Sequence, residues 1–202
     1  MNKSIREYGV TLLLSSHPAV RRLKRLHRTS IHGNKLWSSS WVLMDFLDRQ
    51  RIPPGLRIMD VGCGWGLLGI YCAKTLGAEV TSVDSDPEVF PFLDLHAGIN
   101  KVKITTMKRG LGGLTVGDLQ GFDVLVGADV CFWDNLAPVL KRLINRALKA
   151  SVRMVLISDP GRQPFYDLAE YYSKWNGAEI MDWRIKSPKK MDGRIIKIGA
   201  IF

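Results

Sequence analysis

A glycine-rich loop flanked by an acid is the part of the sequence with the clearest chemistry. It runs from Asp60 to Gly69, directly after a short apolar run, and places glycines at Gly62, Gly64 and Gly66. Glycines at alternate positions allow an unusual backbone turn and let a ligand lie against bare main chain. A helix that follows such a loop points the positive end of its dipole at the ligand. The spacing therefore predicts a ligand-binding loop between a strand and a helix.

A second acid, Asp84, ends the next apolar run, about twenty residues after Gly64. A carboxylate at that place can accept hydrogen bonds from both hydroxyls of a ribose. The spacing from Gly64 to Gly69 also satisfies the dinucleotide fingerprint, which leaves a nicotinamide-dependent oxidoreductase as an alternative. Asp60 speaks against that alternative, because its charge would repel a pyrophosphate on the loop. The same charge suits a cofactor with a positive amino group and a sulfonium.

The elements that must position these residues alternate between helix and strand. Expected strands are Leu56–Val61, Glu79–Val83, Val102–Met107, Phe122–Ala128, Met154–Ser158, Glu179–Lys186 and Arg194–Phe202. Expected helices begin near Ser38 and at Leu67, Pro87, Asp134 and Phe165. This alternation predicts a mostly parallel sheet with helices on both faces. A short turn joins the last two strands, so they should form an antiparallel hairpin.

The pattern D-x-G-x-G-x-G from Asp60 to Gly66, with an acid ending the next strand, resembles the cofactor loop of class I (seven-β-strand) methyltransferases. The expected terminal hairpin also resembles that family, and the resemblance covers roughly residues 36–202. It implies an α/β, doubly wound sheet of order 3-2-1-4-5-7-6, with S-adenosylmethionine as cofactor and S-adenosylhomocysteine as product. The implied cofactor-binding residues are Trp37, Asp60, Gly62, Gly64, Gly66, Asp84, Ser85, Gly110, Leu111 and Ala128.

Further segments resemble the protein-lysine methyltransferases of this fold, the group that acts on calmodulin, valosin-containing protein and the electron-transfer-flavoprotein β-subunit. These segments are residues 36–41, residues 127–132 and the run Asp159-Pro160-Gly161-Arg162. The resemblance implies Asp129 and Phe132 as catalytic residues and Trp133 and Arg162 as substrate contacts. Asp129 would orient the substrate ammonium and help to remove its proton, while Phe132 and Trp133 line the lysine side chain.

The sequence departs from the family at two places and leaves several interpretations open. Phe132 stands where the group has a tyrosine, and residues 108–111 lack the acid that many members place on the adenine amino group, so backbone groups must serve there.

Asp129 could instead cap a helix, and Arg162 could be an ion-pair partner. An N-P-P-Y motif is absent, which counts against amide or adenine methylation, and Cys131 suits packing better than cytosine chemistry. The acceptor could also be RNA or a small molecule, and the chain could be a silent binding module.

Composition and charge limit the classes of protein to which the chain can belong. The chain has 202 residues, of which 46% are hydrophobic, which excludes a mostly disordered protein. No apolar run approaches 18 residues, so no membrane-spanning helix is expected. Of the net charge of +10, residues 1–35 carry +7 and residues 184–197 carry +5, which leaves the remainder at −2.

The basic segments suggest a domain division and a partner. We expect residues 1–35 to form a basic N-terminal helical extension and residues 36–202 the methyltransferase domain. An acidic protein is favoured over nucleic acid as partner, because Tyr8 is the one aromatic residue besides histidine in residues 1–35. The three cysteines are scattered, as are the four histidines, so we expect neither a disulfide framework nor a metal site. A reducing, cytoplasmic location follows, with a mitochondrial presequence as the minor alternative.

Overall fold

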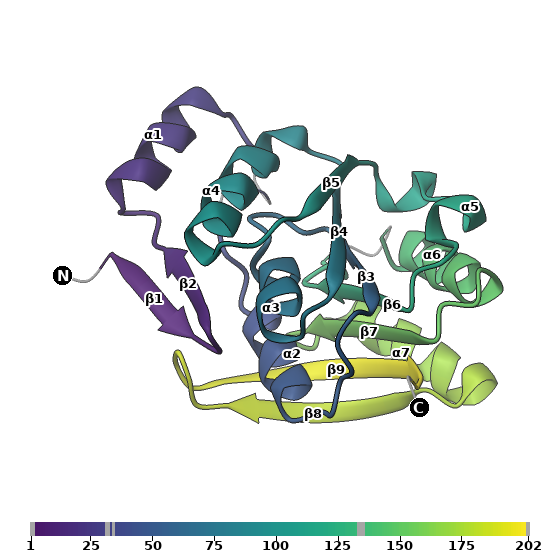
Figure 1. The fold of residues 1–202 in the computed structure, drawn as a ribbon. Coiled ribbons are helices and arrows are strands. Elements are labelled where there is room, and N and C mark those ends of the chain that lie inside the picture. Colours follow the sequence, from purple (N-terminus) through teal and green to yellow (C-terminus); the bar gives the residue numbers. More distant parts are fainter. Residues whose placement is uncertain (1–2, 31–32, 34, 133–135, 201–202) are drawn as a thin grey trace.

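A mostly parallel sheet forms the centre of the computed structural model, which describes residues 3–30, 33, 35–132 and 136–200 (Figure 1). Its seven strands lie in the order β5-β4-β3-β6-β7-β9-β8. They are β3 (Arg57–Val61), β4 (Glu79–Asp84), β5 (Thr105–Lys108), β6 (Val124–Ala128), β7 (Met154–Asp159), β8 (Glu179–Ile185) and β9 (Met191–Gly199). Strands β3 to β7 pair in parallel, and β9 runs antiparallel to both β7 and β8. The predicted fold, strand order and terminal hairpin are confirmed.

Helices cover both faces of the sheet because successive strand side chains point to opposite sides. Ile58 packs with α2 (Ser39–Asp48), α3 (Leu67–Thr75) and α4 (Phe90–Asn100), whereas its neighbour Met59 packs with α5 (Val116–Leu119), α6 (Leu136–Lys149) and α7 (Gln163–Asn176). Two short 3-10 turns, Pro87–Val89 and Leu111–Gly113, follow β4 and β5. No helix in the described ranges is both long and apolar enough to cross a bilayer.

The N-terminal segment contains more structure than the sequence predicted. The expected basic helix is present as α1 (Pro18–Leu26), but a small antiparallel sheet of β1 (Ser4–Glu7) and β2 (Val10–Leu13) precedes it. Val10 and Leu12 are fully buried in the same core as α2 and α3. The side-chain amide of Asn100 on α4 bonds both main-chain groups of Thr11, at 2.8 and 2.7 Å. A side chain of α4 therefore takes the place of a neighbouring strand beside β2.

Candidate active site

The glycine loop lies between β3 and α3, and its two sides differ. Gly64 has φ +51°, and a side chain there would meet no atom within 4 Å, so its backbone faces open space. Gly66 has φ +78° and precedes Leu67, the first residue of α3. A Cβ at Gly66 would lie 2.5 Å from the Leu93 side chain of α4. The loop is thus packed tightly on its inner side and bare on its outer side, as a ligand cradle must be.

Asp84 at the end of β4 joins the glycine loop to the loop after β4. Its Oδ2 accepts a hydrogen bond from the Gly64 N–H and its Oδ1 one from the Asp86 N–H, both at 3.0 Å. Burial raises the pKa of this carboxyl, and the two N–H donors partly offset that effect. Each carboxylate oxygen keeps a second lone pair, so Asp84 can also accept bonds from ribose hydroxyls.

Asp60 lies beneath the glycine loop, with 2% of its surface exposed. Its Oδ2 accepts a hydrogen bond from the Gly69 N–H in the first turn of α3, at 3.1 Å. Burial raises the pKa of this carboxyl to about 7, opposed by the Gly69 N–H and increased by the charge of Asp84. The glycine-loop pattern predicts Asp60 against the cofactor's amino group. In the structure Asp60 anchors the first turn of α3 through Gly69, and its contact with the cofactor stays a prediction.

The loops after β4 and β5 approach each other beside this cradle. A Cβ at Gly110 would lie 3.9 Å from the Ser85 Cβ, so two residues predicted to bind the nucleoside are neighbours. The carbonyl oxygen of Leu111 accepts a hydrogen bond from the Arg146 guanidinium at 2.9 Å, which fixes this loop to α6. Ala128 ends β6, the strand beside β3. The loops after β3, β4, β5 and β6 thus follow neighbouring strand ends, where sheets of this type bind ligands.

A buried ion-pair network surrounds Asp129, directly after β6. Its Oδ2 accepts a hydrogen bond from the Ser39 N–H of α2 at 2.9 Å, and its Oδ1 one from the Arg162 guanidinium at 3.0 Å. Arg162 also donates to the buried Asp159 carboxylate at 2.7 Å. Asp129 therefore caps α2 and pairs with Arg162. It has φ +59°, a costly backbone conformation for a residue with a side chain and one that clusters at functional sites.

One pocket of about 440 Å³ brings together three predicted site residues, Trp37, Asp129 and Arg162. They stand far apart in the sequence and come from the segment before α2 and from the ends of β6 and β7. The rest of the lining comes from the two hairpins and from the chain around these residues: Ile5, Leu14, Lys35, Leu36, Ser38, Trp41, Pro160, Pro188, Lys189 and Met191. Phe132, predicted as a catalytic residue, is half-buried three positions after Asp129 and is not among the residues that line this pocket. Trp133, predicted as a substrate contact, and Asp134, predicted as a helix cap, lie outside the described residues.

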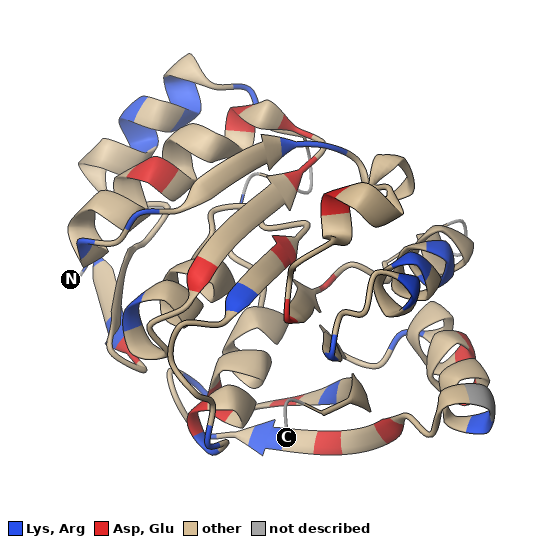
Figure 2. Cartoon of the chain, turned by 45° about the vertical axis from the view of Figure 1, so that its right-hand side comes forward, with Lys and Arg blue, Asp and Glu red and all other residues tan. Residues whose placement is uncertain are grey.

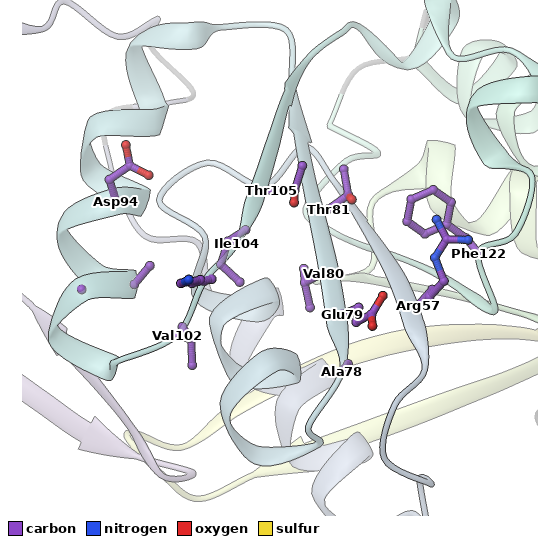
Figure 3. A pocket seen from close by; sticks show the side chains of 13 residues that line it. Arg57, Ala78, Glu79, Val80, Thr81, Asp94, Val102, Ile104, Thr105 and Phe122 are labelled. Atoms are coloured by element: carbon purple, nitrogen blue, oxygen red, sulfur yellow. The ribbon is translucent and has the colours of Figure 1, made fainter.

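A larger pocket, of about 1000 Å³, lies at the other end of the sheet (Figure 3). Arg57, Glu79 and Thr105 line it, and they are the first residues of β3, β4 and β5. Doubly wound sheets bind their ligands at the carboxyl ends of the strands. The larger pocket is therefore distinct from the site that the glycine loop and Asp129 mark.

Comparisons with known proteins agree with this arrangement. Residues 32–124 match the family model of the methyltransferase small domain. Protein N-lysine methyltransferase METTL21A of Danio rerio is 29% identical over 130 residues, which make up 61% of this chain and 58% of that protein. Electron transfer flavoprotein beta subunit lysine methyltransferase of Xenopus laevis is 29% identical over 140 residues, 66% of this chain and 56% of that protein.

A shorter match and a solved structure extend the comparison. Ubiquinone biosynthesis O-methyltransferase of Xanthomonas campestris pv. campestris is 33% identical over 84 residues, 42% of this chain and 35% of that protein. The matched segments thus make up 35 to 58% of these curated relatives. The structure of M. capricolum TrmK in complex with S-adenosyl-homocysteine has a TM-score of 0.56 and 13% identity, covering 74% of this chain and 64% of TrmK. At that identity the likeness concerns the fold.

Proposed function

We propose that this chain, which has the fold and the sequence motifs of class I methyltransferases, transfers a methyl group from S-adenosylmethionine to the side-chain amine of a protein lysine. The observation that carries the proposal is the shared pocket of Trp37, Asp129 and Arg162 at the carboxyl ends of β6 and β7. The two lysine methyltransferases among the relatives support the choice of acceptor.

The cofactor would lie on the bare side of the glycine loop. Gly62, Gly64 and Gly66 would take its amino-acid portion against their backbone, and Asp84 would bind the ribose. The loops that contain Ser85, Gly110 and Leu111 would border the nucleoside through backbone groups. The open space at Gly64 and the remaining lone pairs of Asp84 support this fit. When bound, the cofactor supplies an activated methyl group on a sulfonium.

The residues of the pocket would prepare the acceptor. Methyl transfer needs an amine that is positioned and deprotonated. Asp129, held by Ser39 and Arg162, would bind the incoming ammonium and accept its proton. Trp37, which the resemblance places beside the cofactor, also lines this pocket and would offer the acceptor an aromatic face; the Nζ of Lys35 lies 4.1 Å from the centre of its ring. Asp129 would thus orient the amine and take its proton, and Trp37 would contact the lysine side chain.

Location and domain division remain part of the proposal. A reducing, cytoplasmic location is proposed from the scattered positions of the three cysteines in the sequence. A boundary near residue 35 stays a prediction, and β1, β2 and α1 contribute buried side chains to the protein core.

An Asp129→Asn variant tests the proposal. We expect transfer of labelled methyl groups into protein lysine to fall about 100-fold, because the amide cannot accept the proton. Binding of S-adenosylhomocysteine should remain, since Asp129 lies outside the cradle. Asp167→Asn, an exposed acid on α7, is the matched control and should retain full transfer. Full transfer by Asp129→Asn would remove its assigned role, and label in nuclease-sensitive material would overturn the protein substrate.

A further inference from the structure

We infer that the acceptor lysine lies in an acidic segment of its protein, and that carboxylates beside it pair with Lys35 and Lys189 at the pocket. This inference rests on the proposed function, since it concerns the residues that flank the methylated lysine. It assigns Lys35 and Lys189 as residues that determine substrate specificity.

Among the charged residues that line the pocket, basic side chains outnumber acidic ones. Lys35, Arg162 and Lys189 are basic, and Asp129 is the acid that lines it with them. Arg162 pairs with Asp129 at 3.0 Å and with the buried Asp159 at 2.7 Å, so these three residues form one network with a single net negative charge. Lys35 and Lys189 are exposed, and within the described parts of the chain no acid forms an ion pair with either. Lys35 and Lys189 are therefore the two cations at the pocket that can pair with carboxylates of a bound molecule.

These charges conflict with a cationic acceptor unless the substrate compensates them. Like charges at short range near a protein surface repel each other. Beside Lys35 and Lys189, a lysine ammonium therefore gains less from Asp129 than it would without these two cations. Carboxylates on neighbouring substrate residues would remove the conflict by pairing with Lys35 and Lys189. A carboxylate on Lys35 would also draw its ammonium from the Trp37 ring and free that ring for the acceptor.

Helix α1, which follows the pocket residue Leu14 in the chain, is also basic. Leu14 lines the pocket, and α1 begins four residues later with exposed Arg21, Arg22, Lys24 and Arg25. None of these four forms an ion pair with a residue that the structure describes. Figure 2 shows the basic residues of α1 gathered on this helix, at the upper left of the view. An acidic segment longer than the lysine and its neighbours would thus find further cations along α1.

Nucleic acid would supply the same charge, but apart from Trp37, whose ring contacts the Lys35 ammonium, this surface offers bases little to stack on. Trp65, beside α1, is 2% exposed and stacks on Phe92 at 4.9 Å. The Tyr8 hydroxyl donates to Asp45, at 3.0 Å, and its ring packs against the core. Stacking on exposed aromatic side chains is what single-stranded nucleic acid requires. An acidic protein segment fits the surface better.

The test compares two peptides of equal length in which a central lysine is flanked by Glu and Asp or by Gln and Asn. Fluorescence anisotropy measures their binding, and mass spectrometry measures their methylation. We expect the acidic peptide to bind at least tenfold more tightly at low salt, and the difference to shrink as salt is added. In the Lys35→Glu/Lys189→Glu variant the preference should disappear, and a peptide with Arg flanks should become the better ligand.

A matched variant and three contrary outcomes make the test decisive. Lys103→Glu/Lys149→Glu makes the same change of charge at exposed residues away from the pocket, and should keep the wild-type preference. Equal binding and methylation of both peptides by the wild type would overturn this inference and leave lysine methylation intact. Transfer to no protein lysine at all would overturn the proposed function instead. Stronger competition by a single-stranded RNA than by the acidic peptide would overturn the choice of partner.

Discussion

Two buried carboxyl groups, Asp60 and Asp84, hold the glycine loop from different sides. Asp60 bonds the N–H of Gly69 below the loop, and Asp84 bonds the N–H of Gly64. Burial raises the pKa of each, because charge is unfavourable in an apolar surrounding. The loop is therefore supported by groups whose charge costs stability, which makes its stability dependent on pH.

Replacing Asp60 by Asn should change that dependence. The pKa of Asp60 is about 7 in the folded protein against a usual 3.8, so the folded protein holds a proton that the unfolded chain releases. The stability from this group is complete below about pH 3.8 and is lost as the pH rises to about 7. Asp60→Asn should therefore be more stable than the wild type at pH 8 by roughly 2–4 kcal/mol and equally stable near pH 4.

Urea denaturation of both proteins between pH 4 and 8 measures this difference, and the contributions of other groups cancel in the comparison. Asp123→Asn is a control of opposite sign. The Arg57 N–H lowers the pKa of Asp123, so its stabilising effect is present at neutral pH and lost in acid. A difference between the wild type and Asp60→Asn that does not vary with pH would contradict the assignment.

Residue types indicated the glycine loop and its two acids more clearly than the pocket around Asp129. Glycine spacing and the two acids depend on local sequence, so their places at the ends of β3 and β4 could be predicted. The burial of Asp60 could not, because it depends on how α3 packs over β3. The contacts of Asp129 with Ser39 and Arg162 join residues 90 and 33 positions apart in the sequence. They also depend on a left-handed backbone conformation at Asp129, which its residue type does not predict.

At the scale of elements, the spacing of apolar residues along the sequence predicted the strands of the sheet and the helices that cover it. The β1–β2 hairpin was missed because its strands have four residues each, too few to show a period. Its position depends on α4 instead. Besides the contact of Asn100 with Thr11, the Nε2 of His96 accepts the Leu13 N–H at 3.2 Å. Such long-range polar contacts leave no signal in the local sequence.

Asn100→Ala should loosen this hairpin without unfolding the sheet. The change leaves the N–H and C=O of Thr11 without their partner, which costs about 1–3 kcal/mol. Amide hydrogen exchange at Thr11 and Leu13 should speed up, while exchange in α6 stays slow. Asp94→Ala, at an exposed position on the same helix, should leave the hairpin unchanged. Slow exchange at Thr11 in Asn100→Ala would show that other contacts hold β2.

At the scale of the whole molecule, binding of S-adenosylhomocysteine should raise the melting temperature. At a hundred times its dissociation constant a ligand stabilises by about 2.7 kcal/mol, which for a chain of this size is a shift of roughly 5–10 °C. Asp84→Asn should reduce the shift, because the ribose loses its charged acceptor. NAD(H) should produce no shift, and a shift with NAD(H) alone would show that the dinucleotide interpretation of the loop was correct.

The position of β9 sets the order in which the site can be completed during synthesis. β9 lies between β7 and β8, so the last strand of the sheet to leave the ribosome is an internal one. Until it inserts, β7 is an unpaired edge, and the wall formed by Lys189 and Met191 is missing from the pocket. The glycine loop and Asp84 precede these residues by about a hundred positions. A nascent chain thus contains the proposed cofactor cradle well before it contains the whole of the proposed acceptor pocket.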